Sequence, residues 1–262
     1  MKIAFWSPMH GTGATSGLLA TAIALTENCG KKVLVTQNHY DMNNMEKPLL
    51  GKIDDREFFG ETGLDAIIRH FKSGNITGEQ IVNCTIGITD KFHLLAGTKV
   101  CSREAYENSL VRNIVQKVMS LMDKYYDVVL VDTNSGNDPG SFGIMEESDL
   151  IVVNMRQNRE MIDEFMKNSF FDNRKIFYLF GNYDETSKYS LQNLRHIYRK
   201  IRKDNSGGIP HSTGYMDAIC DERVMRYMQA NFVADGDYYE EDFFKSISEI
   251  AKKMLILAGK EV

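Results

Sequence analysis

Residues 7–16 read Ser7-Pro8-Met9-His10-Gly11-Thr12-Gly13-Ala14-Thr15-Ser16. They follow a short apolar strand predicted over residues 3–6 and precede a helix of small residues predicted over about 14–27. Glycines in such a turn let backbone N–H groups converge on an anion, and the start of the next helix adds partial positive charge. The stretch therefore predicts a phosphate site; the alternative is a tight turn that only connects a strand to a helix.

A dinucleotide loop fits this stretch poorly. That loop has the pattern G-x-G-x-x-G directly after the strand, whereas here Gly11 and Gly13 are followed by Ser16, and four residues stand between Trp6 and Gly11. The acid that would hold the ribose is also missing, because the second predicted strand ends in the residues Thr-Gln-Asn of 36–38.

The mononucleotide loop G-x-x-x-x-G-K-[ST] matches the length of the stretch better. Gly13 and Thr15 occupy the positions of its last glycine and its hydroxyl residue. Ala14 replaces the lysine and Pro8 replaces the first glycine, so the match is partial.

The rest of the chain alternates short apolar strands with amphipathic helices. Continuously apolar strands joined by helical crossovers indicate a parallel sheet that is covered on both faces. We therefore expect one doubly wound, mainly parallel α/β domain over residues 1–262. The predicted strands are residues 3–6, 32–35, 92–96, 127–132, 149–153 and 175–179.

Three helix starts are predicted from capping residues, at Thr62, Ser102 and Asp237. Residues 37–60 are expected to be irregular because glycines interrupt them. The last helix carries an apolar stripe, which we expect to pack on the sheet. Acidic residues at its start would be repelled by anionic lipid, which argues against direct membrane insertion.

Composition narrows the class of protein. The chain has 43% apolar and 26% charged residues and a net charge of −5, which argues against a dedicated nucleic-acid binder. The longest apolar run, residues 18–25, is far shorter than the ~20 residues of a transmembrane helix. We expect a cytoplasmic protein whose widely spaced cysteines are free, mostly buried thiols: Cys29, Cys84, Cys101 and Cys220.

Four segments together resemble the ParA/MinD family of deviant Walker-type ATPases, whose phosphate loop reads K-G-G-x-G-K-T-T. Residues 9–16 take the place of that loop, and residues 31–46 parallel the segment around the second strand. Residues 126–133 resemble the Walker B strand, and residues 208–211 resemble the late segment that borders the nucleotide base. The resemblance implies a P-loop NTPase-like fold.

The same resemblance implies a site for ATP or ADP with Mg²⁺. It assigns the metal to the Thr15 hydroxyl and to Asp132, which would hold a water of the ion. The nucleotide-contacting positions that it implies are His10, Gly11, Thr12, Gly13, Ala14, Thr15, Ser16, Pro210 and His211.

The departures from the family pattern fall on charged positions. Met9 replaces the lysine that crosses a dimer interface, and Ala14 replaces the lysine that holds the phosphates. Gln37 replaces the aspartate that orients the attacking water, and His39 replaces a second aspartate. Each lost charged hydrogen bond removes roughly 1.5–3 kcal/mol. We therefore expect weak nucleotide binding, little or no hydrolysis and no assigned catalytic residue.

An alanine in place of the loop lysine resembles the TadZ/CpaE branch, which localises pilus or secretion machinery. We expect a homodimeric, nucleotide-binding localisation or scaffold protein with such partners. Two alternatives stay open: an active partitioning-type ATPase rebuilt with another cation such as Arg156, and a pseudo-nucleotidase that acts only through protein contacts. The basic run at 195–203 is interpreted as a solvated helix end, because cations suit helix C-termini, so DNA is not an expected partner.

Overall fold

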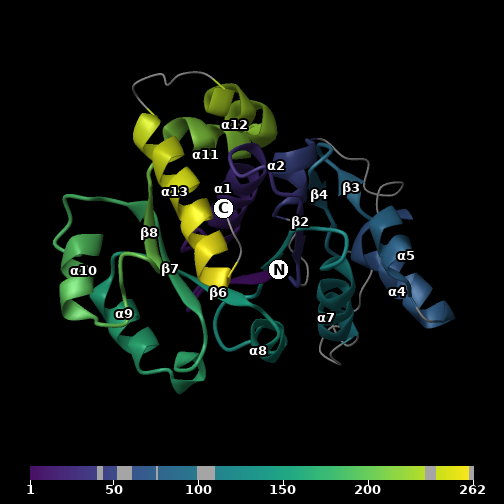
Figure 1. The fold of residues 1–262 in the computed structure, drawn as a ribbon, viewed down its shortest axis with the longest axis horizontal. Coiled ribbons are helices and arrows are strands. Elements are labelled where there is room, and N and C mark those ends of the chain that lie inside the picture. Colours follow the sequence, from purple (N-terminus) through teal and green to yellow (C-terminus); the bar gives the residue numbers. More distant parts are fainter. Residues whose placement is uncertain (40–43, 52–60, 75, 99–109, 234–239, 260–262) are drawn as a thin grey trace.

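The computed structural model describes the chain except residues 40–43, 52–60, 75, 99–109, 234–239 and 260–262. Its strands form one sheet in the order β3-β4-β2-β5-β1-β6-β7-β8 (Figure 1). Neighbouring strands are parallel except for the β3–β4 pair. The strands are β1 (Lys2–Trp6), β2 (Val33–Gln37), β3 (Ile86–Gly87), β4 (Phe92–Leu94), β5 (Val128–Asp132), β6 (Leu150–Met155), β7 (Ile176–Tyr183) and β8 (Ser206–Pro210).

Helices cover both faces of this sheet, and each face has its own hydrophobic core. On one face pack α1 (Ala14–Glu27), α2 (Glu46–Leu50), α11 (Thr213–Cys220), α12 (Val224–Val233) and α13 (Glu241–Ala258). On the other pack α4 (Gly63–Ser73), α5 (Gly78–Asn83), α7 (Leu110–Met122), α8 (Pro139–Glu146), α9 (Arg159–Met166), η1 (Ser169–Phe171) and α10 (Leu191–Ile197). The expected doubly wound α/β fold is confirmed.

The central strands consist largely of apolar residues, so both of their faces can be buried. Every residue of β5 and β6 is buried, as are all residues of β2. Strands with two buried faces are typical of parallel sheets covered by helices.

The order in which the chain adds strands to the sheet changes direction at β1. Strand β5 lies on one side of β1, and the next strand along the chain, β6, lies on the other side. Ligands of open α/β sheets bind at the carboxyl ends of the strands near such a point.

Several local predictions were wrong. The region expected to be irregular contains the short helix α2, whose Met45 and Leu49 pack into the core. The helix α4 does begin after Thr62, as predicted, but the Thr62 side chain makes no capping hydrogen bond. In α4, Leu64, Ile67 and Ile68 are buried, whereas Phe71 near the end of the helix is 43% exposed.

The other capping residues give a mixed result. Ser102 and Asp237 lie outside the described residues. α13 begins after Glu240, and its apolar stripe packs against α1 and β8, as predicted.

Of the three cysteines that the structure describes, only Cys84 is buried. The prediction of mostly buried thiols is therefore wrong for the described ones.

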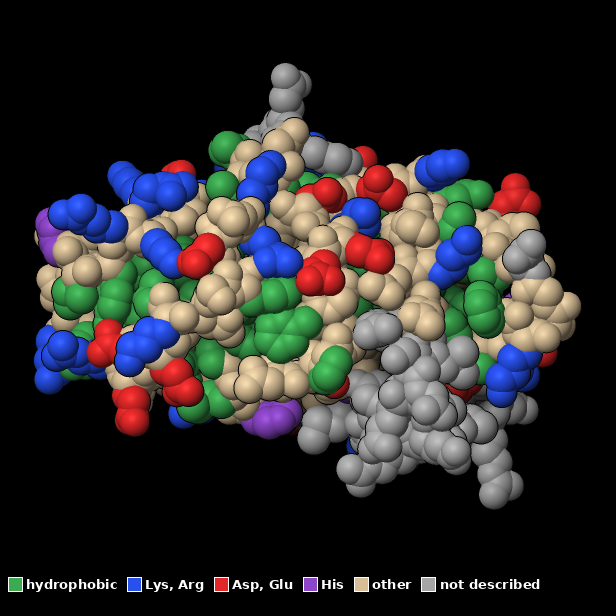
Figure 2. Space-filling view, turned by 90° about the horizontal axis from the view of Figure 1, so that it is seen from below, with side chains coloured by type: hydrophobic (Ala, Val, Ile, Leu, Met, Phe, Trp, Pro, Cys, Tyr) green, Lys and Arg blue, Asp and Glu red, His purple; other side chains and the backbone are tan. Residues whose placement is uncertain are grey.

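The helices of the described residues and the face in Figure 2 show how apolar and charged side chains are distributed. Among the described residues, no helix is both long enough and apolar enough to cross a bilayer. Figure 2 shows acidic and basic side chains interspersed over one face, with small hydrophobic patches between them. Within the basic run, Lys200 pairs with Asp172 and Arg202 pairs with Asp204, which agrees with a solvated helix end.

Candidate functional site: the loop between β1 and α1

Glycines and hydroxyl groups determine the conformation of the loop after β1. Gly11 and Gly13 have φ values of 75° and 87°, in the left-handed region that glycine adopts without strain. The Thr12 hydroxyl donates to Ser7 Oγ at 2.7 Å, and Ser7 Oγ donates to the Met9 carbonyl at 2.5 Å. These hydrogen bonds between residues of the loop stabilise its conformation.

The start of α1 leaves backbone donors free for a ligand. Gly13 is the N-cap and supplies no side-chain cap, and the first turn carries no acidic residue. The helix ladder begins with the bond from Gly17 N to Gly13 O at 2.8 Å, so the amides of residues 14–16 precede it. Such amides, together with the positive end of the helix dipole, suit a phosphate.

Two cavities adjoin the loop in the described part of the chain. One, of about 440 Å³, is lined by all seven expected loop residues, from His10 to Ser16, and by His39 and Asp132. The other, of about 450 Å³, is lined by the loop together with Pro210 and His211. We call them the metal-side cavity and the base-side cavity. The expected nucleotide-contacting residues are thus brought together around one loop.

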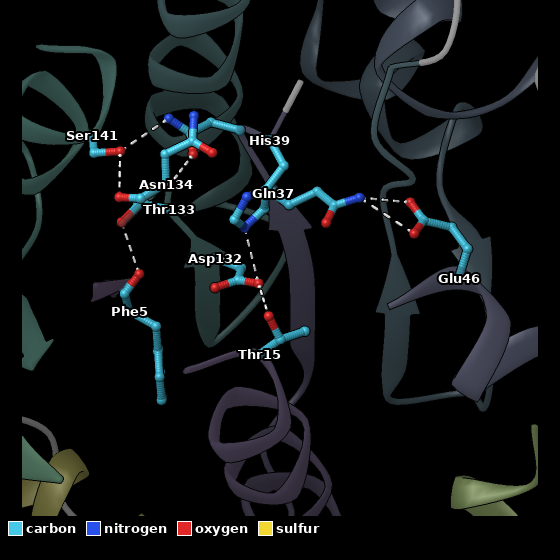
Figure 3. A network of polar contacts seen from close by, with 10 residues as sticks. Phe5, Thr15, Gln37, His39, Glu46, Asp132, Thr133, Asn134 and Ser141 are labelled. Carbon is cyan, nitrogen blue, oxygen red and sulfur yellow. Dashed lines mark hydrogen bonds and ion pairs between the residues drawn. The ribbon is translucent and has the colours of Figure 1, made fainter. Parts of the chain in front are cut away.

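Thr15, Asp132 and His39 meet at the metal-side cavity (Figure 3). The Thr15 hydroxyl donates to Asp132 Oδ2 at 2.6 Å, and His39 Nε2 lies 3.1 Å from the same oxygen. Burial alone would lower the pKa of His39, but its contact with Asp132 and the negative charge there raise the pKa above its usual value. His39 is 8% exposed, so it is buried beside Asp132.

The residues present fit a divalent cation. Asp132 is fully buried, and its Oδ1 has no hydrogen-bond partner among the described residues. A buried carboxylate oxygen of that kind is costly unless a cation or donor satisfies it. With the Thr15 hydroxyl beside it, the pair supplies the oxygen ligands that Mg²⁺ prefers.

Gln37 does not face the metal-side cavity. Its Nε2 donates to both oxygens of Glu46, at 3.0 and 3.3 Å, and Glu46 also accepts from Gly97 N at 2.7 Å (Figure 3). Gln37 and Glu46 are 0% and 1% exposed. Gln37, which stands where the resembled family has its water-orienting aspartate, therefore hydrogen-bonds the buried carboxylate of Glu46 in α2.

The loop after β5 is tied to the end of β2. Asn38 Oδ1 accepts from Asn134 N at 2.9 Å, and Ser141 Oγ donates to Asn134 O at 2.9 Å (Figure 3). The indole of Trp6, the sole tryptophan, donates to Gly136 O at 3.0 Å. Since Trp6 immediately precedes the phosphate loop, its fluorescence is a natural reporter of both loops.

Several residues at or beside the base-side cavity make contacts that the sequence did not indicate. Arg156 lies after β6 and donates to the Gly11 carbonyl. The Tyr215 hydroxyl donates to Ser16 O at 2.6 Å, and Glu240 accepts from Ser212 and Tyr227. The Arg156 and Tyr215 contacts join residues 145 and 199 positions apart, which no local pattern could reveal.

Gly181 of β7 is a further residue that the sequence did not single out. A Cβ at this position would lie 2.8 Å from the Thr12 carbonyl oxygen, which belongs to the backbone of the loop. We expect Gly181→Ala to lower the free energy of unfolding by about 1–3 kcal/mol, because the loop must shift to make room. Denaturant unfolding measures this change.

The matched control is Gly87→Ala, where the added Cβ would meet its nearest neighbours only at 3.8 Å. The control should unfold at nearly the wild-type denaturant concentration. Equal midpoints for both variants would show that the loop does not press against β7.

No protein-family model matches the chain, and no curated protein is similar to it in sequence. Solved structures are similar in fold. A ParA family ATPase from Chlorobium tepidum TLS matches with a TM-score of 0.71 at 13% identity, covering 95% of this chain and 98% of that one. MinD from Pyrococcus horikoshii OT3, complexed with Mg-ADP, matches with a TM-score of 0.66 at 15% identity, covering 98% and 97%.

A third solved structure is a putative plasmid partition protein from Borrelia burgdorferi B31 bound to AMPPNP. It matches with a TM-score of 0.66 at 18% identity, covering 97% of this chain and 98% of that one. At these identities the likeness shows the fold, which is that of the ParA/MinD P-loop NTPases.

Proposed function

We propose that the chain is a nucleotide-binding protein of the ParA/MinD type that binds ATP or ADP with Mg²⁺ and hydrolyses ATP little or not at all. The observation that carries this proposal is the loop of residues 10–16, whose backbone surrounds the metal-side cavity although its lysine is absent. Phosphate recognition by backbone amides does not depend on side chains. Two structural neighbours hold AMPPNP and Mg-ADP, which supports the choice of ligand.

Binding without turnover follows from the side chains at the cavity. Phosphoryl transfer relies on positioned charge and on a group that orients the nucleophile. Ala14 supplies no cation, and Gln37 is engaged by Glu46. When bound, Mg²⁺ would neutralise phosphate charge, with Thr15 and Asp132 as the residues that hold it. The described groups at the cavity thus bind and orient, and none of these described groups is placed to activate water.

The rebuilt-ATPase alternative rests on Arg156. Its guanidinium reaches the Gly11 carbonyl, so it can add positive charge to a bound phosphate. It lines the base-side cavity and not the metal-side cavity that contains Asp132. This placement favours a contribution to binding over a contribution to turnover. For the wider role we propose localisation or scaffolding, as in the TadZ/CpaE branch, with pilus or secretion proteins as partners.

We expect the purified chain to release phosphate from ATP no faster than the Thr15→Ala variant does. The physical reason is that Ala14 stands in place of the phosphate lysine and Gln37 in place of the water-orienting aspartate of the resembled family. A coupled phosphate-release assay on wild type and variant measures the difference. Steady release by the wild type that Thr15→Ala abolishes would favour the rebuilt ATPase.

We also expect a homodimer whose formation does not require nucleotide. In the resembled family a lysine at position 9 reaches the partner's nucleotide, and here Met9 is an apolar side chain that is 48% exposed. Without this lysine, one subunit places no such positive charge on the ATP of the other, so dimerisation should not depend on ATP. Sedimentation velocity with and without ATP and Mg²⁺ measures this. A chain that is monomeric in both states, or dimeric only with ATP, contradicts the expectation.

A further inference from the structure

Three donor atoms from three separate elements converge at the metal-side cavity. Thr15 comes from the first turn of α1, Asp132 ends β5, and His39 follows the end of β2. Asp132 Oδ2 lies 2.6 Å from Thr15 Oγ1 and 3.1 Å from His39 Nε2. Atoms bound to one ion at about 2.0–2.2 Å lie roughly 3 Å apart. Asp132 Oδ2 is therefore spaced from each of the other two atoms much as two ligands of one cation are.

Two polar atoms of these side chains, Asp132 Oδ1 and His39 Nε2, have no hydrogen-bond partner among the described residues. The approach of His39 Nε2 to Asp132 is close enough for an ion pair but is not aligned as a hydrogen bond. Both side chains are buried, at 8% and 0% exposure. Leaving two such groups incompletely satisfied costs free energy, and a bound cation would satisfy both.

The histidine changes which cation suits the site. Oxygen ligands alone favour Mg²⁺, whereas an imidazole nitrogen favours divalent ions of the first transition row over Mg²⁺. We propose that His39 supplies a nitrogen ligand to the metal of this site, so that the site takes Mn²⁺, Co²⁺ or Zn²⁺ in preference to Mg²⁺. This inference rests on the proposed nucleotide site, because it concerns the cation of that site.

The test uses Mn²⁺ with the full chain and without nucleotide, at one mildly alkaline pH, since a proton competes with a metal for imidazole. Electron paramagnetic resonance measures free Mn²⁺, and its spin-echo form detects a directly bound nitrogen. We expect nitrogen coupling in the wild type, and Mg²⁺ in at least about tenfold excess should be needed to displace half of the Mn²⁺.

Two histidine variants provide the matched comparison. His39→Asn should lose about tenfold or more in Mn²⁺ affinity, and its Mg²⁺ affinity should stay within about twofold. His196→Asn, at an exposed residue of α10 that lines neither cavity, should change neither. If His39→Asn does not fold, the nitrogen coupling decides in His10→Asn, which removes the other histidine of the metal-side cavity: coupling that persists supports the inference, and coupling that is lost overturns it.

The contrary results are equally distinct. Bound Mn²⁺ without nitrogen coupling, or tighter metal binding by His39→Asn, would show that His39 is a counter-ion of Asp132 that competes with the metal. Absence of any Mn²⁺ binding would also overturn the inference. Titration with ATP in the absence of divalent ions tests the nucleotide site separately, so failure of the metal inference is distinguishable from failure of the proposed function.

Discussion

Replacing Ala14 with lysine should tighten ATP binding by roughly 10- to 100-fold, because a charged hydrogen bond to phosphate contributes about 1.5–3 kcal/mol. Ala14 is the first residue of α1, lines the metal-side cavity and is only partly buried. A lysine there has both access to the cavity and a place beside the backbone amides. Isothermal titration calorimetry with ATP and Mg²⁺ measures the change.

The control for this variant is Ala14→Met, which lengthens the side chain without adding charge. It should leave the affinity within about threefold of wild type, since it adds no charged hydrogen bond. A lysine variant that binds no better than the methionine variant would show that the loop does not hold phosphates in the expected geometry. The lysine alone should not restore hydrolysis, because Gln37 stays engaged by Glu46.

Replacing Gln37 with aspartate should lower the free energy of unfolding by roughly 3–5 kcal/mol, the range for an uncompensated buried charge. The change would restore the residue type of the resembled family, yet it would place a carboxylate beside the buried carboxylate of Glu46. Both positions are at most 1% exposed. Urea denaturation measures the loss.

Two further variants separate charge from shape. Gln37→Met has nearly the same length and removes only the hydrogen bonds, so its cost should be smaller, about 1–3 kcal/mol. The double variant with Gln37→Asp and Glu46→Gln exchanges amide and carboxylate and should recover most of the loss. If Gln37→Asp alone is as stable as wild type, the contact with Glu46 does not determine the residue at position 37.

Local patterns predicted the fold well because the sheet is built from continuous apolar runs. The helix expected over about 14–27 runs from Ala14 to Glu27, and the strand expected at 127–132 is β5, Val128–Asp132. The glycines, the small residues and the apolar period are all local signals, and each agrees with its tertiary setting. The carboxyl-edge position of the phosphate loop followed from the order of elements alone.

Contacts between distant segments were beyond such patterns. The hydrogen bond between Gln37 and Glu46 could not be predicted from the sequence. The segment that forms α2 was expected to be irregular, so nothing placed Glu46 beside Gln37. The edge strand β8 was missed because glycines and a proline make it weakly strand-like. The approach of Gly181 to Thr12 depends on how β7 lies beside the loop, which only the tertiary structure reveals.

The most direct test of nucleotide binding by residues 10–16 is calorimetric titration of the purified chain with ATP and Mg²⁺. Binding is expected to saturate at one nucleotide per chain. It should be weaker in Thr15→Ala, which loses the hydroxyl beside Asp132, and the Trp6 fluorescence should change in step, because its indole bonds the loop after β5. Absence of saturable binding up to millimolar ATP, with the fluorescence unchanged, would contradict the account and leave the loop as a connection between a strand and a helix.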